Sequence, residues 1–133
     1  MEAGLALPLE KTVLVVEDND LNRQLLEVRL EMLGYGSLTT TTGIAGVDVA
    51  RKELPDLILM DIQLPDISGI EAIRRLKADD RTKAIPIVAI TAFALRSEKE
   101  RILASGCDAY IAKPFRGEEL DALIKRYTSQ RSQ

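Results

Sequence analysis

Short apolar runs alternate along this chain with segments in which apolar residues recur at helical spacing. The runs at 13–16, 57–60 and 87–90 are continuously apolar, which is typical of strands covered on both faces of a parallel sheet. A weaker run and a run nearer the C-terminus complete the set. The predicted strands are Val13–Val16, Ser37–Thr40, Leu57–Met60, Ile87–Ile90 and Ala109–Ala112.

The segments between these runs predict helices. In the first, apolar residues form one stripe, and Gly34 is placed to end the helix as a C-cap. That stripe consists of Leu21, Leu25, Val28 and Met32. The other helical segments are Ile44–Ala50, Ile70–Leu76, Leu95–Ala104 and Leu120–Tyr127. Strands that alternate with helices of this length predict right-handed βαβ units in a doubly wound α/β sheet.

One domain accounts for the whole pattern, since 133 residues are enough to build a single hydrophobic core. Residues 1–10 show no usable period, and residues 128–133 are small and polar. Both segments are therefore expected to be flexible tails. The predicted domain spans 11–127.

Charge and composition argue against several classes of function. The net charge is −3 and the basic residues are scattered, so no nucleic-acid surface is predicted. No apolar run reaches the roughly eighteen residues of a membrane helix. A single cysteine, Cys107, and an N-terminus without a basic leader favour the cytoplasm. The chain contains no histidine, which excludes Ser-His-Asp and Cys-His catalysis and a His-ligated zinc.

Carboxylates end two of the apolar runs. Glu17 and Asp18 follow the first run, and Asp61 follows the third. Because the carboxyl ends of parallel strands open into one crevice, these acids are expected to share a pocket. Two like charges about 4 Å apart repel by roughly 4 kcal/mol at an effective dielectric of 20, so the cluster calls for a cation. An all-oxygen ligand set with room for water and a phosphate suits Mg²⁺, for which Mn²⁺ is expected to substitute.

The remaining strand ends carry a hydroxyl and an ammonium. Thr91 follows the fourth run, and Lys113 with Pro114 follows the fifth. A carboxylate that accepts a phosphoryl group needs a metal on one side, an ammonium against the growing charge and a hydroxyl for another oxygen. The strand ends supply each of these parts.

With these residues in order, the chain resembles the receiver domain of two-component response regulators over Lys11 to Tyr127. Thr91 lies 30 residues, and Lys113 lies 52 residues, after Asp61, as the resemblance requires. The segments 16–19, 60–65 and 91–94 are most similar to DivK-type single-domain regulators of cell-cycle phosphorelays. The resemblance implies a flavodoxin-like (βα)5 fold with the strand order 2-1-3-4-5.

The resemblance also implies roles for individual residues. Asp61 would be the phosphoacceptor, with Lys113 and Thr91 contacting the phosphoryl group. Mg²⁺ would be bound by Asp18, Asp61 and the main-chain carbonyl of Gln63, and by Glu17 through water. Thr91 and Tyr110 would form the switch pair, and Pro114 would follow a cis peptide bond.

The partners implied by the resemblance are proteins. A histidine kinase or a histidine phosphotransfer protein would donate the phosphoryl group. A downstream protein would bind the face made by the fourth helix, the fifth strand and the fifth helix. Phosphorylation would change this face through a shift of residues 93–101. The chain is expected to be a monomer or a weak dimer that binds neither nucleic acid nor membrane.

Two other functions fit parts of the pattern. A Mg²⁺-dependent aspartyl-phosphate phosphatase typically carries a second Asp two residues after its nucleophile, whereas Gln63 stands there, and glutamine cannot exchange protons. The chain could also be a receiver cut from a hybrid histidine kinase or a longer regulator.

Each motif also has a purely structural interpretation. Asp18 and Asp61 are good helix-capping or turn residues, and Thr91 could cap the fourth helix. Lys113 with Pro114 could be a plain turn, and Tyr110 could simply fill the core. All of these readings would have to hold together to explain the pattern without a site.

Overall fold

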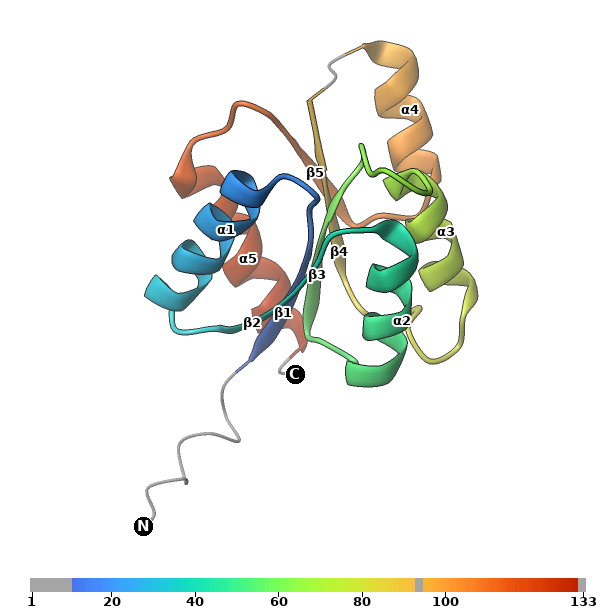
Figure 1. Ribbon diagram of the computed structural model, residues 1–133. Helices are drawn as coiled ribbons and strands as arrows, with labels where there is room; N and C mark the ends of the chain where they lie inside the picture. Colours follow the sequence, from blue (N-terminus) through green and yellow to red (C-terminus); the bar gives the residue numbers. More distant parts are fainter. Residues whose placement is uncertain (1–10, 93–94, 132–133) are drawn as a thin grey trace.

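The computed structural model describes residues 11–92 and 95–131 (Figure 1). Five parallel strands pair in the order β2-β1-β3-β4-β5, so the predicted doubly wound α/β fold and its strand order are confirmed. The strands are β1 Thr12–Val16, β2 Gly36–Thr40, β3 Leu57–Asp61, β4 Ile87–Thr91 and β5 Ala109–Ala112. The helices are α1 Asp20–Met32, α2 Gly43–Glu53, α3 Gly69–Ala78, α4 Arg96–Ala104 and α5 Gly117–Arg131. The predicted N-terminal tail, residues 1–10, lies outside the described residues.

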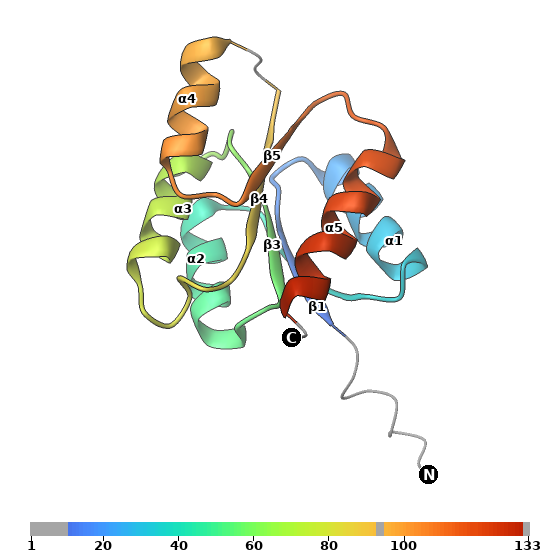
Figure 2. The ribbon, with the colours of Figure 1, turned by 180° about the vertical axis from the view of Figure 1, so that it is seen from behind.

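The sheet lies between two helical layers. Helices α1 and α5 cover one face, and α2, α3 and α4 cover the other (Figures 1 and 2). Because successive side chains of a strand point to opposite faces, each central strand contributes to two cores. Leu14 and Ile58 belong to the core under α2, α3 and α4, whereas Val13 and Leu57 belong to the core under α1 and α5. The continuously apolar runs are thereby explained.

Strand β2 is at the edge of the sheet, next to β1. Its residues are half-buried or exposed, whereas every residue of β3 and β4 is buried. An edge strand has less apolar surface to cover, which explains why its run is the weaker one in the sequence.

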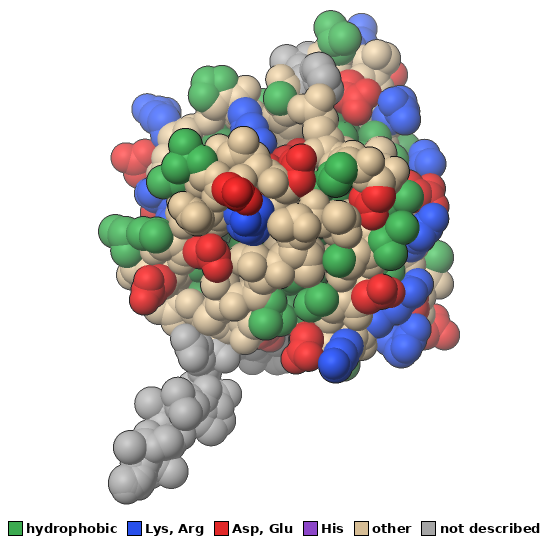
Figure 3. Space-filling model, in the orientation of Figure 1, with side chains coloured by type: hydrophobic (Ala, Val, Ile, Leu, Met, Phe, Trp, Pro, Cys, Tyr) green, Lys and Arg blue, Asp and Glu red, His purple; other side chains and the backbone are tan. Residues whose placement is uncertain are grey.

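Helix α1 does not bury the apolar stripe that marks it in the sequence. Leu21, Leu25, Val28 and Met32 are exposed by 63%, 59%, 51% and 78%. The helix instead packs Leu26, Leu30 and the half-buried residue Leu33 against the sheet. Apolar side chains accordingly appear on the surface over α1, at the left of Figure 3.

The predicted C-terminal tail is wrong for residues 128–131, because α5 continues to Arg131. Thr128 is 2% exposed and its hydroxyl donates to the Ile124 carbonyl at 2.7 Å. It also lies 2.9 Å from the Tyr35 hydroxyl. One helical turn beyond Ile124, Thr128 falls on the buried face of α5, and its hydroxyl is hydrogen-bonded there.

Within the described residues, no helix is long and apolar enough to cross a membrane.

Candidate functional site

The strand register brings the predicted site residues to one edge of the sheet. Val16 of β1 pairs with Met60 of β3, so the residues that follow them, Glu17 and Asp61, are neighbours. Asp61 pairs with Ile90 of β4, one position before Thr91. Thr91 in turn pairs with Ala112 of β5, which precedes Lys113. The sheet alone therefore aligns the ends of four strands.

Three carboxylates gather at this edge. Glu17, Asp18 and Asp61 each offer an oxygen, and these oxygens all lie within 4.8 Å of one another. Glu17 and Asp61 are 2% and 4% exposed, whereas Asp18 is exposed to solvent. A buried pair of like charges is unfavourable unless a cation compensates it. The oxygen donors, two buried and one open to water, fit a hard cation that retains water, as Mg²⁺ does.

The electrostatics of Glu17 reflect this crowding. Burial raises the pKa of Glu17 above its ordinary value, and the negative charge of Asp61 acts in the same direction. The backbone N–H of Asn19 donates to Glu17 Oε2 at 3.1 Å and opposes the rise. The metal-free site therefore disfavours full ionisation, and a bound cation would favour it.

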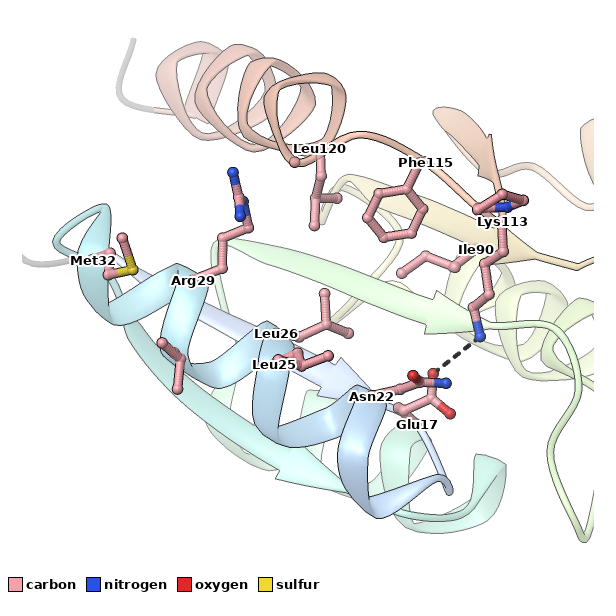
Figure 4. Close-up of a pocket in the computed structure, with 13 residues that line it drawn as sticks. Glu17, Asn22, Leu25, Leu26, Arg29, Met32, Ile90, Lys113, Phe115 and Leu120 are labelled. Carbon is pink, nitrogen blue, oxygen red and sulfur yellow. Dashed lines mark hydrogen bonds and ion pairs between the residues drawn. The ribbon is translucent and has the colours of Figure 1, made fainter.

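Lys113 faces both buried acids. Its Nζ lies 3.4 Å from Glu17 Oε1 and 3.5 Å from Asp61 Oδ2 (Figure 4 shows the contact to Glu17). Both distances exceed the roughly 2.7–2.9 Å of a close charge-assisted hydrogen bond. The ammonium thus offsets the charge of the carboxylates and leaves their oxygens free to accept further ligands.

The loop after β3 is tied closely to Asp61. The Gln63 N–H donates to Asp61 Oδ1 at 2.9 Å, which fixes the backbone of residue 63 beside the acids. The Gly69 N–H donates to the Ile62 carbonyl at 2.8 Å and closes the loop at its base. A Cβ on Gly69 would lie 2.2 Å from the Asp61 carbonyl oxygen, so only glycine fits there. The Gln63 side chain is exposed.

Thr91 and Tyr110, the predicted switch pair, lie on one face of the sheet. Thr91 is fully buried, and Tyr110 is half-buried against the core under α2, α3 and α4. Tyr110 pairs with Ala89, two residues before Thr91, and alternation puts Ala89 and Thr91 on the same face. The Lys113 N–H donates to the Thr91 carbonyl at 2.7 Å, and the Lys113–Pro114 bond is cis. Residues 93–94, which follow this site, lie outside the described residues.

The purely structural readings of these motifs fare differently. The N-cap of α1 is Asn19, not Asp18, and the N-cap of α4 is Leu95, not Thr91. Lys113 reaches the acids and is therefore more than part of a turn. Asp61 does accept a local N–H from Gln63, and Tyr110 does pack in the core, so these two residues also have the structural roles considered for them.

Arg23 is a site residue that the sequence analysis missed. Its Nη1 donates to the Glu17 carbonyl at 3.1 Å and to the Asp18 carbonyl at 3.5 Å, and its Nη2 pairs with Asp20 at 2.6 Å. The guanidinium therefore holds the loop that presents the two acids. Its position one turn into α1 could have predicted this role, because a long side chain there can reach back over the loop before the helix.

A groove of about 590 Å³ opens from the acids along the cleft between α1 and α5. Glu17 and Lys113 line one end, and Met32 lines the other (Figure 4). The wall between them is mostly apolar and includes Leu25 and Phe115. The exposed stripe of α1 thus borders a groove that starts at the site itself.

On this parallel sheet, three carboxylates and the Lys113 ammonium meet at the ends of the strands. The model of the response regulator receiver domain matches residues 13–125, and the chain belongs to this family. It is therefore a two-component receiver.

Curated relatives refine this assignment. The chain is 46% identical over 119 residues to the polar-differentiation response regulator DivK of Brucella anthropi, covering 90% of this chain and 97% of that protein. The DivK protein of Brucella ovis is 45% identical over the same length. The match covers nearly the whole of these relatives, and the chain is DivK-like.

Solved structures agree with the fold. A receiver domain of a sensor histidine kinase from Pseudomonas aeruginosa PAO1 is 37% identical, with a TM-score of 0.85 over 90% of this chain and 98% of that one. That structure has a magnesium ion coordinated in its active-site cleft. A CheY-like receiver domain from Methanospirillum hungatei JF-1 is 27% identical, with a TM-score of 0.86 over 92% and 97% of the two chains.

Proposed function

We propose that this chain is a stand-alone response regulator in which Asp61 accepts a phosphoryl group from a phosphohistidine. One observation carries the proposal: Asp61 meets Glu17 and Asp18 within 4.8 Å, and the Lys113 ammonium faces it at 3.5 Å. The chain contains no histidine, so the donor phosphohistidine lies outside these 133 residues, in a histidine kinase or a phosphotransfer domain.

In the transfer, a carboxylate oxygen of Asp61 forms a bond to phosphorus. The bond between phosphorus and the donor imidazole nitrogen breaks, and its electron pair stays on that nitrogen. Phosphoryl transfer of this kind depends on positioning and on stabilisation of charge at the phosphoryl oxygens. Lys113 supplies a positive charge at Asp61 Oδ2, and the Gln63 N–H holds Oδ1, which together orient the nucleophile.

Mg²⁺ would be held by Asp18, Asp61 and the Gln63 carbonyl, with Glu17 acting through water. When bound, the ion would neutralise the acids and the incoming phosphoryl oxygens. The crowding of buried carboxylates supports this ligand set, as does the magnesium in the cleft of the related Pseudomonas receiver. The residues of this chain keep the ligands together: Arg23 holds the loop of Glu17 and Asp18.

We further propose that the donor docks on α1. The exposed stripe there has spacings of four, three and four residues, which is the pattern with which helices interdigitate. It borders the groove whose far end is lined by Glu17 and Lys113. A helical donor lying on this stripe would have its phosphohistidine close to Asp61. Exposed apolar patches of this kind mark protein-binding surfaces.

The output is proposed to leave through the surface made by α4, β5 and α5, of which only α4 lies on the face of the sheet opposite α1. Phosphorylation draws Thr91 toward the phosphoryl oxygens, and Tyr110 turns into the space behind it. The shared face of these two residues, under α4, supports the coupling. Leu95, the N-cap residue of α4, and Leu103 within this helix are 68% and 55% exposed and are available to a partner. Two states that differ by a few kcal/mol suffice for such a switch.

The likeness to polar-differentiation regulators supports a place in a cytoplasmic phosphorelay that controls the cell cycle or differentiation. A second candidate is a receiver that belongs to a hybrid histidine kinase, which the 37% identity to a kinase receiver supports. The match over 97% of a DivK protein favours the first.

The test is phosphorylation by a small donor. Incubation with Mg²⁺ and phosphoramidate is expected to add one phosphoryl group, and Asp61→Asn is expected to remain unmodified. Asp18→Asn is expected to weaken Mg²⁺ binding by about tenfold or more, because it removes a direct anionic ligand. Glu31→Gln is the matched control, since it removes an exposed negative charge near the other end of α1. A phosphorylated Asp61→Asn protein would refute the proposal.

A further inference from the structure

The N-terminus of α2 is capped by a carboxylate from another segment of the chain. Asp66, in the loop between β3 and α3, accepts the Gly43 N–H on Oδ1 at 2.8 Å and the Ile44 N–H on Oδ2 at 2.9 Å. These N–H groups belong to the first residues of α2, which have no partner within the helix. The two segments are 23 and 22 residues apart in the sequence.

Helix α2 depends on this distant carboxylate. It has no acidic residue in its own first turn, whereas each of the other four helices has at least one. A negative charge at that end is favourable because of the helix dipole. Although burial opposes it, the N–H groups of Ile44 and Gly43 hold the pKa of Asp66 below its ordinary value. The carboxylate is therefore charged at neutral pH.

The close approach is built into the sequence. A Cβ on Gly43 would lie 2.6 Å from Ile67 Cγ1 and 3.3 Å from Asp66 Oδ1. A larger residue there would push the loop away from α2. Glycine at the first position of α2 therefore permits the loop to lie directly on the end of the helix.

The loop held in this way is the one that carries the acceptor site. It begins directly after Asp61, its base is closed by the bond between Ile62 and Gly69, and Gln63 lies three residues before Asp66. Leu64 and Ile67 pack against the core but are only partly buried. The two hydrogen bonds that Asp66 accepts join the tip of this loop to α2.

We propose that Asp66 is a positioning residue for the acceptor site, which holds the Gln63 backbone in place by clamping the β3–α3 loop to α2. The proposal rests on the proposed function, in which the Gln63 carbonyl binds Mg²⁺. Because coupling between two equilibria is reciprocal, Mg²⁺ bound at the acids also tightens the clamp on α2. The N-terminus of α2 then reports the state of the site.

The first measurement is the Mg²⁺ affinity of wild type, Asp66→Ala and Thr42→Ala, by calorimetry. Thr42 caps the same end of α2, since its hydroxyl accepts the Ala45 N–H at 3.1 Å, but it makes no bond to the β3–α3 loop through its side chain. Asp66→Ala is expected to weaken Mg²⁺ binding by about tenfold, as loss of an outer-sphere partner does, with Thr42→Ala unchanged. Unchanged affinity in Asp66→Ala, or an equal loss in both variants, would overturn the proposal.

The second measurement uses wild type alone, so it holds even if a variant does not fold. Mg²⁺ is expected to slow hydrogen exchange at the Gly43 and Ile44 amides, and not at the Arg81 amide, which donates to a carboxylate oxygen of Asp79 in the turn after α3. Equal exchange at Gly43 and Ile44 with and without Mg²⁺ would refute the coupling. A wild type that does not bind Mg²⁺ would instead refute the proposed function, so the two failures are distinguishable.

Discussion

The ammonium of Lys113 lies 3.5 Å from Oδ2 of Asp61, although the two residues are 52 positions apart in the chain. The same nitrogen lies 3.4 Å from Glu17 Oε1. The ends of strands β1, β3 and β5 thus each bring one charged side chain to the same site: Glu17, Asp61 and Lys113. A lysine in this position offsets the charge of two carboxylates, and in the proposed function it would also stabilise the charge of an incoming phosphoryl group.

Lys113→Ala is expected to slow phosphorylation by phosphoramidate by about 100-fold, the usual effect of losing one aligned charge donor. Lys113→Arg is also expected to be impaired, because a planar guanidinium does not reproduce the geometry of a compact ammonium. The measurement is the rate of phosphoryl incorporation at saturating Mg²⁺. Lys52→Ala, on the exposed side of α2, is the control and should react as wild type does. Normal rates in Lys113→Ala would mean that the lysine is only a surface charge.

Glu17 makes stability depend on pH and metal. Because the folded-state pKa lies above the ordinary 4.5, the fold favours the protonated carboxyl. This contribution is fully present below pH 4.5 and is lost as the pH rises through the folded-state pKa. Without divalent metal, Glu17→Gln is therefore expected to be more stable than wild type at pH 7 and to lose that advantage at pH 4.

Urea unfolding in EDTA at the two pH values measures this difference. Saturating Mg²⁺ is expected to reduce or reverse the advantage of Glu17→Gln at pH 7, because the cation favours the ionised acid in wild type. Glu31→Gln, an exposed position on α1, serves as the control. If the stability advantage of Glu17→Gln had the same size at pH 4 and pH 7, the charge of Glu17 would not be what destabilises the metal-free wild type.

Thr91→Ala is expected to accept a phosphoryl group at Asp61 but to lose most of the phosphorylation-dependent gain in affinity for a downstream partner. In the proposed switch, the Thr91 hydroxyl moves toward the phosphoryl oxygens and vacates the space into which Tyr110 turns, so its removal would uncouple Tyr110 from phosphorylation. Titration of a cognate partner against wild type and Thr91→Ala, each with and without beryllofluoride, measures the gain. An undiminished gain in Thr91→Ala would refute this route and leave the acceptor assignment intact.

The two apolar stripes of α1 are expected to separate stability from donor recognition. Leu30→Ala should cost about 2–5 kcal/mol of unfolding free energy, because Leu30 is fully buried. Leu25→Ala should change it by no more than about 0.5 kcal/mol. Leu25→Ala should nevertheless slow transfer from a protein phosphodonor by about tenfold, which corresponds to about 1.4 kcal/mol of lost docking energy.

Labelling by phosphoramidate should be unchanged in Leu25→Ala, since the small donor does not use the helix. Leu103→Ala, an exposed position on α4, is the control for loss of apolar surface and should leave transfer from the donor intact. If both variants slow transfer equally, the donor does not dock on α1.

The sequence by itself determined the layout of this protein. Apolar runs of strand length are buried on both faces, so their position could be predicted within a residue or two of β1, β3 and β4. The acids, Thr91 and Lys113 stand directly after such runs. Because parallel strands end on one edge, it could be predicted that they converge. These features are local in the chain, or follow from topology alone.

Only the tertiary structure decided which of two equivalent patterns is buried. Leu21, Leu25 and Val28 have helical spacing, and so do Leu26, Leu30 and Leu33; periodicity cannot say which stripe faces the sheet. The direction in which the chain leaves β1 and begins α1 decides which stripe faces the sheet. The same holds for Arg23 over the acidic loop and for Asp66 on the end of α2, which are contacts of ordinary polar residues. Such contacts are fixed by how the elements pack in three dimensions, and spacing along the chain carries no record of them.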